Sequence, residues 1–358
     1  MAREDTGLLK EFLNAAVARG ASDLHLAQGY RPTLRIQGDL VEIPGEPLDA
    51  ARIESVVSAM FPPGAAERLE ERRSVDFAFS FDCEGRTERF RASVFYTRGE
   101  RAVCVRHIPS KIPDLADLGF PEELAGRIAA LTNGLVLVTG ITGAGKSTTL
   151  ASLVKRINHA GGCRIITIEE PVEYLFDHAP RSMVTQREVG SDVPSFYEGL
   201  RSGLRQDPDL LLVGEIRDRE TAQLALSAAE TGHVIFATLH SPDARGAITR
   251  LVDLFPSEQQ NEVRTQLSMS LRFVVAQHLL PARERGGRRV LALEVLSANF
   301  AVRASIRTGK IEALDTAIQS GRRDGMWSLD QHLKQLVQEG RIDAATARQF
   351  AKDLDEVG

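Results

Sequence analysis

The octapeptide GITGAGKS at positions 140–147 is the feature that most restricts the fold of this 358-residue chain. It matches the pattern G-x-x-x-x-G-K-[ST], which lies between a buried strand and a helix in proteins that bind nucleoside phosphates. Here the apolar run LVLVT precedes the loop and the amphipathic stretch KSTTLASLVKRINHA begins within it. The sequence therefore predicts a strand–loop–helix unit of an α/β fold.

Each residue type in this loop has its own task around a phosphate. The glycines let the backbone wrap the phosphate oxygens, and the helix that follows adds the positive end of its dipole. Lys146 is expected to reach the β- and γ-phosphates, and Ser147 to ligate Mg²⁺. The predicted nucleotide-binding residues are Gly140, Thr142, Gly143, Ala144, Gly145, Lys146, Ser147 and Thr148.

Two later apolar runs end in acidic residues. Residues 165–168 lead into Glu169 and Glu170, and residues 210–213 lead through Gly214 into Glu215. Ligands of open parallel sheets bind outside the carboxyl ends of the strands, which places both carboxylates near the γ-phosphate. A carboxylate there can orient the attacking water or hold a metal through water. Glu169 and Glu215 are the predicted catalytic acids.

Two histidines flank a fourth apolar run, VIFATL. His240 follows the run, on the side expected to hold phosphate, whereas His233 precedes it at the opposite end. An imidazole near the γ-phosphate can donate a hydrogen bond and report whether that phosphate is present. Packing or surface exposure is the alternative role for either histidine.

The pattern of the chain divides it into two domains. Residues 1–108 combine helical spacing with strongly alternating stretches and indicate an α+β domain. Pro109 and Pro113 mark a linker over 109–119. From residue 120 onward, apolar runs alternate with amphipathic stretches, as in a parallel sheet with crossover helices. From about residue 257 the chain is expected to be helical, including 257–280, with one short strand over 289–296.

Charge and composition exclude several classes of protein. A formal net charge of −5 and a pI of about 6.0 disfavour a sequence-independent nucleic-acid binder. Three distant cysteines, Cys83, Cys104 and Cys163, contain no CxxC pair and predict neither a disulfide framework nor a zinc ribbon. No apolar run approaches the roughly 18–20 residues that span a bilayer, and the N-terminus has no apolar signal core. A cytoplasmic location is therefore expected.

Over about residues 5–340 the chain resembles the PilT family, the hexameric type IV pilus retraction ATPases of the secretion-ATPase superfamily. The resemblance is carried by GASDLHL (20–26), VTGITGAGKSTTLASLV (138–154), TIEEPVEYLF (167–176), QREVGSDVPSFYEGLRSGLRQDPDLLLVGEIRD (186–218), AAETGHVIFATLHSPDA (228–244) and RLVDLFP (250–256). It implies a PAS-like N-terminal domain, a RecA-like P-loop NTPase domain with a helical C-terminal extension, and ATP and Mg²⁺ as cofactors.

The resemblance also implies roles for individual residues. Glu169 corresponds to the general base of the family's Asp box, in which Glu170 stands where Asp is usual. Glu215 would act through Mg²⁺-bound water, and His233 and His240 delimit the His box.

Family members bring arginines of the N-terminal domain to the nucleotide, which suggests Arg91 and Arg106. Arg217 follows the second acid and could join them. Surface arginines are the alternative role for all three, because the whole chain is rich in arginine.

The function implied is a hexameric motor that acts at the inner membrane on a platform protein and drives pilin disassembly. Two alternatives stay open: an accessory ATPase of the PilU type, and a nucleotide-switch component of a ring beside a paralogous motor. A nucleic-acid translocase is disfavoured by the charge. One segment departs from its relatives, because Ala301–Arg307 reads AVRASIR where retraction ATPases carry a sequence close to AIRNLIR.

Overall fold

The computed structural model describes residues 5–36, 38–108, 111–284 and 287–357. Two compact units make up the chain. The N-terminal unit comprises residues 1–111 together with 170–175, and the second unit comprises 112–169 and 176–358. Pro109, which marks the start of the predicted linker, lies outside the described residues. The expected boundaries of 1–108, 109–119 and 120–358 stay a prediction.

The N-terminal unit is a six-stranded antiparallel sheet in the order β3-β2-β1-β6-β5-β4. The long strands β4 to β6 alternate between buried and exposed side chains, the pattern of a sheet with one face on a core. Helices α1 to α3 contribute to that core. The elements are α1 (Asp5–Ala18), β1 (Asp23–Leu26), β2 (Thr33–Ile36), β3 (Asp39–Glu42), α2 (Ala50–Met60), α3 (Ala65–Arg72), β4 (Ser74–Cys83), β5 (Arg86–Thr97) and β6 (Glu100–Ile108).

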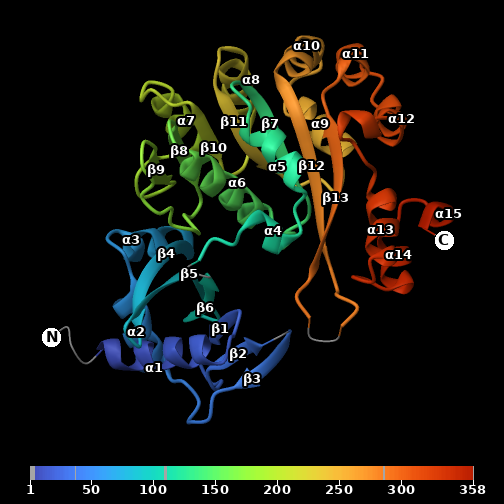
Figure 1. Cartoon of the computed structure of the whole chain (residues 1–358). Helices are drawn as coiled ribbons and strands as arrows, with labels where there is room; N and C mark the ends of the chain where they lie inside the picture. The colour runs from blue at the N-terminus through green and yellow to red at the C-terminus, as the bar shows by residue number, and fades with distance from the viewer. Residues whose placement is uncertain (1–4, 37, 109–110, 285–286, 358) are drawn as a thin grey trace. The chain divides into compact units, whose positions relative to one another are not determined.

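The second unit is built on a seven-stranded sheet in the order β13-β12-β7-β11-β10-β8-β9. Every neighbouring pair is parallel except β12 and β13, which form an antiparallel hairpin, drawn in orange in Figure 1. The strands are β7 (Gly134–Thr139), β8 (Arg164–Glu169), β9 (Met183–Glu188), β10 (Leu210–Val213), β11 (Val234–Leu239), β12 (Leu271–Leu280) and β13 (Val290–Ser297).

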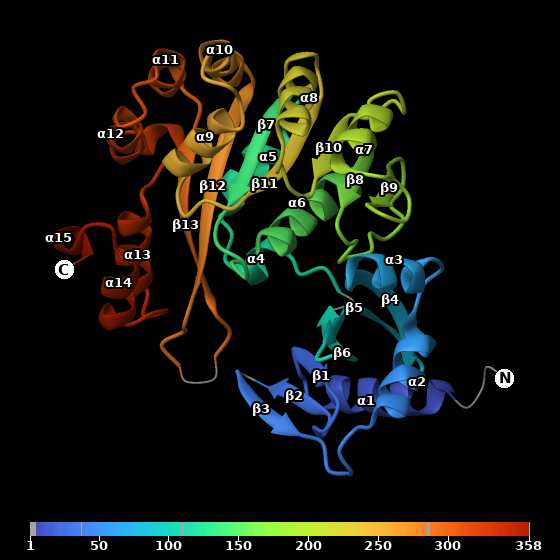
Figure 2. The same cartoon turned by 180° about the vertical axis from the view of Figure 1, so that it is seen from behind.

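Helices cover both faces of this sheet. Successive side chains of a strand point to opposite faces, and they pack in two different cores. Leu135 and Leu137 of β7 join a core with α7 to α12, whereas Val136 and Val138 join one with α4 to α6. Helices α13 and α14 pack on β13, and Figure 2 shows the same elements from behind. The helices are α4 (Leu115–Leu118), α5 (Glu122–Ala129), α6 (Lys146–Ala160), α7 (Phe196–Gly203), α8 (Arg219–Glu230), α9 (Ala244–Asp253), α10 (Gln260–Ser270), α11 (Phe300–Thr308), α12 (Ala313–Ser320), α13 (Leu329–Gln338), α14 (Ala344–Phe350) and α15 (Leu354–Val357).

The expectation of one helix over 257–280 is wrong. Helix α10 ends at Ser270, and residues 271–280 form β12. This strand lies between β7 and β13, with most of its side chains buried, so its sequence is a nearly continuous apolar run. Periodicity alone cannot distinguish such a run from a buried helix. The C-terminal region therefore begins with a helix and a hairpin and becomes helical after Ser297.

No helix among the described residues is both long and apolar enough to cross a membrane.

The packing of α13 on β13 predicts a dependence of stability on pH. His332 is buried, and its Nδ1 accepts a hydrogen bond of 2.9 Å from the Leu293 amide, which requires that nitrogen to be unprotonated. Burial lowers the pKa of His332 below its ordinary value of 6.5. As the pH falls the unfolded chain therefore takes up a proton first, and stability declines below about pH 6.5, by at most about 1.4 kcal/mol per pH unit for one group.

Denaturant unfolding between pH 5 and 7.5 measures this decline. His332→Gln is expected to flatten it, whereas His159→Gln, at an exposed position, keeps the slope of the unmodified chain. Equal slopes in all three proteins would contradict the assignment.

Candidate functional site

The predicted phosphate loop joins β7 to α6 at the carboxyl edge of the parallel strands. Gly143 and Gly145 have φ angles of 81° and 86°, in the left-handed region that glycine enters at little cost. A Cβ atom on Gly140 would lie 2.5 Å from the backbone oxygen of Gln277. Two glycines are thus required by the loop's conformation, and the third by the close approach of β12.

The side chain of Lys146 folds back over this loop. Only 8% of the residue is exposed, and its Nζ donates to the backbone oxygens of Gly140 at 2.9 Å and Ile141 at 3.1 Å. The same nitrogen is 3.4 Å from Nδ1 of His240. The positive charge is therefore held beside the backbone amides that would surround a phosphate.

Glu215 follows β10 and has a partner on each carboxylate oxygen. Its Oε1 is 3.2 Å from Nε2 of His240, and its Oε2 accepts a bond of 2.8 Å from Nε of Arg217. Since Lys146 can only donate and a carboxylate only accept, an imidazole with its proton on Nε2 satisfies both neighbours of His240. Four side chains, Lys146, His240, Glu215 and Arg217, thus form one continuous polar chain.

Gly214 brings the ends of β10 and β8 together. Its N–H donates to the Ile168 oxygen at 2.8 Å. A Cβ atom there would lie 3.2 Å from that oxygen and 3.4 Å from the Cα of Glu169. Because Gly214 has no side chain, the backbone before Glu215 can approach that of Glu169 closely, and the two acidic residues lie at the ends of neighbouring strands.

Glu169 is the last residue of β8 and is oriented by two donors. Its Oε1 accepts bonds from Oγ1 of Thr167 at 2.6 Å and from Nε2 of Gln186 at 3.1 Å. Thr167 is completely buried, and Gln186 belongs to the edge strand β9. These contacts fix the carboxylate at the same edge of the sheet as the phosphate loop, where it could accept a proton from water.

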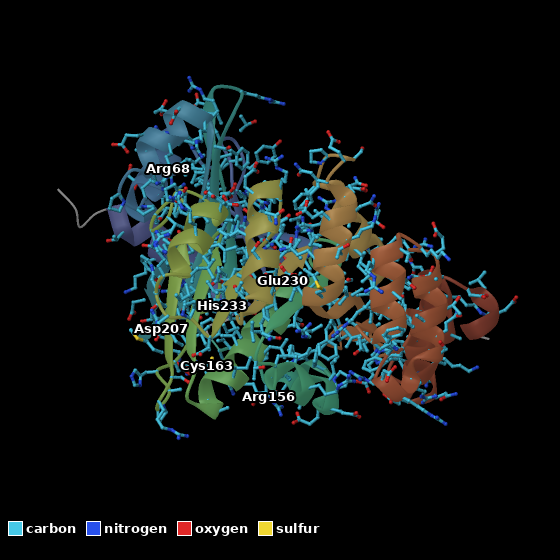
Figure 3. All side chains as sticks on the ribbon, turned by 90° about the horizontal axis from the view of Figure 1, so that it is seen from above. Arg68, Arg156, Cys163, Asp207, Glu230 and His233 are labelled. Atoms are coloured by element: carbon cyan, nitrogen blue, oxygen red, sulfur yellow. The ribbon has the colours of Figure 1, made fainter. Side chains whose placement is uncertain are left out.

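His233 lies at the other end of the sheet. It precedes β11, and its Nδ1 is 3.2 Å from the backbone oxygen of Ala228. In Figure 3 it is seen together with Cys163, Asp207 and Glu230, which also precede strands. Of the two predicted histidines, the structure therefore brings only His240 to the phosphate loop.

Arg91 and Arg106 belong to the N-terminal unit and face carboxylates of that unit. Nε of Arg106 is 2.8 Å from Asp23, and Nη1 of Arg91 is 3.9 Å from Glu173. Glu173 lies in the segment 170–175, which groups with the N-terminal unit although it directly follows β8. The role of both arginines at a nucleotide stays a prediction.

The donor set suits Mg²⁺ better than a metal held by the protein alone. No group of three or more His, Cys, Asp or Glu side chains in the described part of the chain could hold a metal. Mg²⁺ binds through one or two protein oxygens together with waters and substrate phosphates. The exposed Ser147 hydroxyl beside the phosphate loop and the carboxylate of Glu215 fit that kind of site.

Sequence reasoning missed Gln277. It is completely buried in β12, and its Nε2 donates to the Ala144 oxygen at 2.6 Å. β12 pairs with β7 so that Ala276 lies opposite Thr139, which sets Gln277 beside the loop. The available signal was a single amide side chain within an apolar run. Because this run was expected to be a helix, the sequence did not indicate that the amide lies beside the phosphate loop. Arg289, also missed, approaches the Gly143 oxygen at 3.4 Å.

Comparisons with known proteins identify the family of this chain. The profile of the type II/IV secretion system protein family matches residues 5–353. The type IV pilus retraction ATPase PilT of Pseudomonas aeruginosa is 43% identical over 344 residues, 96% of this chain and 98% of that protein. The type IV pilus ATPase PilU of the same organism is 36% identical over 348 residues, 96% of this chain and 90% of that protein.

A crystal structure of the pilus retraction motor PilT with bound ADP superimposes with a TM-score of 0.86. The two chains are 41% identical, and the match covers 97% of this chain and 98% of that one. The expected α/β fold of the RecA-like secretion ATPases is thereby confirmed, while the PAS-like character of the N-terminal unit stays a prediction. The chain belongs to the type II/IV secretion system protein family.

Proposed function

We propose that this chain is an ATPase motor that powers the retraction of a type IV pilus. The polar chain from Lys146 through His240 to Glu215 is the observation that carries the enzymatic part, since it links the phosphate loop to a strand-end acid. The names of two matching proteins, a PilT retraction ATPase and a PilT retraction motor with bound ADP, support the biological part.

In this mechanism ATP binds along the phosphate loop. Lys146 exchanges the oxygens of Gly140 and Ile141 for the β- and γ-phosphates, so its charge becomes available where negative charge develops. Glu169, held by Thr167 and Gln186, accepts a proton from the attacking water. Mg²⁺, held by Ser147 and through water by Glu215, would supply positive charge at the phosphates.

The remaining expectations belong to the same proposal. The chain works as a hexameric ring in the cytoplasm, against an inner-membrane platform protein. Arg217 adds charge beside Glu215, and Arg91 and Arg106 of the N-terminal unit act at the nucleotide. His233, predicted with the catalytic residues, lies at the end of β11 away from the phosphate loop and takes no part in this mechanism. The positive charge of these arginines is attracted to the phosphates of bound ATP. Hydrolysis removes the γ-phosphate and so frees the arginines from that attraction.

An accessory role of the PilU type is the second candidate, favoured by the 36% identity to PilU. A deletion strain distinguishes the two functions. A retraction motor leaves excess surface pili when it is deleted. An accessory ATPase leaves near-normal piliation while its paralogue is present. Loss of pili would indicate assembly and would overturn both.

Two substitutions separate binding from hydrolysis. Lys146→Ala is expected to abolish ATP binding, because it removes the ammonium that would face the β- and γ-phosphates. Glu169→Gln is expected to bind ATP normally while turnover falls at least about 100-fold, the effect of losing a positioned general base. Nucleotide titration and steady-state ATPase rates measure both, with Glu262→Gln on the exposed face of α10 as the control. Unaltered turnover in either variant would remove that residue from the mechanism.

Gln277 provides a test of the loop's support. Gln277→Leu keeps the volume but leaves the Ala144 oxygen without its donor, a loss of about 1–2 kcal/mol. ATP affinity is expected to fall about tenfold. Gln335→Leu, on the surface of α13, is the matched control. Equal affinity in all three proteins would show that β12 supports the fold without supporting the loop.

Substitution in the segment Ala301–Arg307 tests how ATP turnover is coupled to pilus retraction. Val302 and Ile306 are completely buried, and Arg303 donates to the Ala298 oxygen at 2.8 Å, so these three hold α11 in place. Arg307 is exposed on the same helix. Arg307→Ala is expected to change ATP turnover by less than about threefold and to stop retraction, because the residue is available to a partner and absent from the site.

Twitching of a complemented deletion strain, measured beside the ATPase rate of the purified variant, checks this expectation. Arg348→Ala, at another arginine in the last turn of a C-terminal helix, is the control. Normal motility of the Arg307 variant would assign the side chain to solvated surface.

A further inference from the structure

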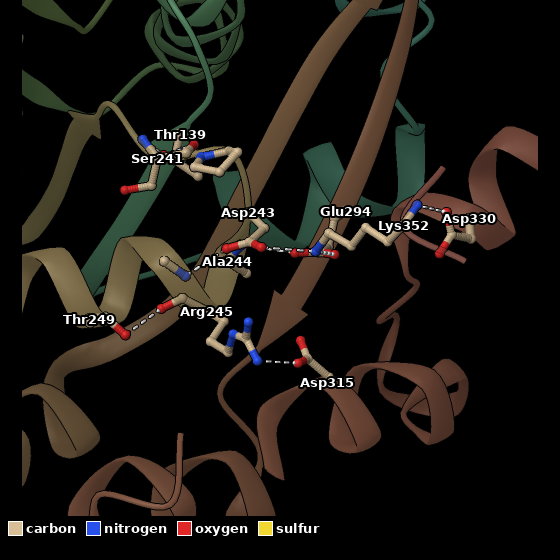
Figure 4. A network of polar contacts seen from close by, with 12 residues as sticks. Thr139, Ser241, Asp243, Ala244, Arg245, Thr249, Glu294, Asp315, Asp330 and Lys352 are labelled. Carbon is tan, nitrogen blue, oxygen red and sulfur yellow. Dashed lines mark hydrogen bonds and ion pairs between the residues drawn. The ribbon is translucent and has the colours of Figure 1, made fainter. Parts of the chain in front are cut away.

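We propose that Lys352, close to the end of the chain, is a positioning residue of the ATPase site: its positive charge, shared by Asp243 and Glu294, neutralises the start of α9 and so keeps in place the segment that carries His240. Figure 4 shows this network. The inference rests on the proposed ATPase function and assigns a catalytic consequence to a tail that shares no residue with the motifs.

One ammonium serves two carboxylates from separate elements. Nζ of Lys352 is 3.2 Å from Oδ2 of Asp243, in the turn before α9, and 2.8 Å from Oε2 of Glu294, on β13. Glu294 is 3% exposed. A carboxylate so deeply buried needs a cation or several hydrogen bonds to remain ionised. Arg245, two residues after Asp243, pairs with Asp315 at 2.9 Å instead.

The same carboxylates also hold the first turn of α9. Oε1 of Glu294 accepts a bond of 2.8 Å from the Ala244 amide, and Oδ1 of Asp243 accepts one of 2.7 Å from the Gly246 amide. Negative charge at the start of a helix is favourable, but two such charges also repel each other, and a cation between them offsets that repulsion. Lys352 supplies that cation.

The charges of Asp243 and Lys352 remain in place at neutral pH. Burial opposes ionisation of Asp243, but the Gly246 amide and the charge of Lys352 outweigh it and lower the pKa of the carboxyl. Burial likewise opposes the charge of Lys352, and Glu294 and Asp243 outweigh it and raise the pKa of the ammonium. Removing Lys352 would therefore leave uncompensated negative charge at the start of α9.

The segment between His240 and Asp243 carries this constraint to the site. The amide of Ser241 donates to Oγ1 of Thr139 at 2.9 Å, and that hydroxyl is 2.7 Å from the Ser241 oxygen. Thr139 is the residue before the phosphate loop. The oxygen of Pro242 faces Nε2 of His278 at 3.1 Å. The segment is thus fixed to β7, to β12 and, through Lys352, to the C-terminal tail, and its first residue is the histidine between Lys146 and Glu215.

The tail is itself fixed, so Lys352 is presented in one place. The backbone amides of Lys352 and Asp353 donate to the two carboxylate oxygens of Asp330, at 2.8 and 3.2 Å. Asp330 is 4% exposed in α13, which packs on β13. The break between α14 and α15 thereby directs the lysine stem toward α9.

Three variants of the full chain test the proposal. Lys352→Met keeps the stem and removes the charge, Lys352→Arg keeps the charge, and a third protein combines Lys352→Met with Asp243→Asn and Glu294→Gln. Lys334→Met, at an exposed position of α13, is the control. The carboxamide oxygens introduced by the last two substitutions can still accept the α9 amides, so the third protein restores charge balance without restoring the bridge.

Lys352→Met is expected to lower kcat about tenfold with ATP affinity changed by less than about threefold. Lys352→Arg and the neutral triple variant should keep kcat within about threefold of the unmodified chain. Thermal unfolding identifies variants that do not fold. A folded Lys352→Met protein with unaltered kcat would overturn the proposal. If that variant does not fold, a folded triple variant with tenfold lower kcat would overturn it and one with normal kcat would support it.

The unmodified chain separates this inference from the proposed function. Absence of ATP hydrolysis in the unmodified chain would refute the function, and with it the inference. Hydrolysis that is equally fast in the unmodified chain and in folded Lys352→Met would refute the inference alone.

Discussion

Strand β7 pairs in parallel with β11 on one side and β12 on the other, and the whole site depends on this pairing. Because parallel strands end at one edge, the phosphate loop after β7 and His240 after β11 meet there. On the other side Gln277 of β12 lies against the same loop, close enough to exclude a side chain at Gly140. A site assembled in this way requires three strands that are distant in sequence to keep one register.

The parts of the site that could be predicted from the sequence are those with a local signature. The phosphate loop is one uninterrupted motif. Glu169 directly follows a short apolar run, and Glu215 follows another with only Gly214 between them, and the ends of these runs define the edge of a sheet. β12 had no such signature, because a strand buried on both faces lacks the alternation that distinguishes it from a helix. Gln277 was missed for the same reason, since its role depends on the strand that lies beside it.

The other contacts that could not be predicted from the sequence join residues far apart along the chain. Lys352 and Glu294 are separated by 58 residues, and no pattern within either segment indicates the other. For the two histidines that flank VIFATL, the sequence predicts the position but not the contacts. Local spacing places His240 and His233 at opposite ends of one strand, and the structure confirms that placement, yet only tertiary contacts show that His240 lies between Lys146 and Glu215.

In the proposed mechanism, His240 is also the residue at which nucleotide binding is coupled to movement. Lys146 can satisfy at most three acceptors, and in this structure it faces two loop oxygens and Nδ1 of His240. In that mechanism Lys146 gives up these acceptors when it turns to phosphate, and the His240 imidazole, released from Lys146, keeps its bond to Glu215. The backbone of His240 continues through Ser241 to Asp243, so a rotation of that ring acts on a segment fixed by Thr139 and Lys352. Phosphate occupancy would thus reach α9 and the C-terminal helices through hydrogen bonds and ion pairs, within one unit and without a change of fold.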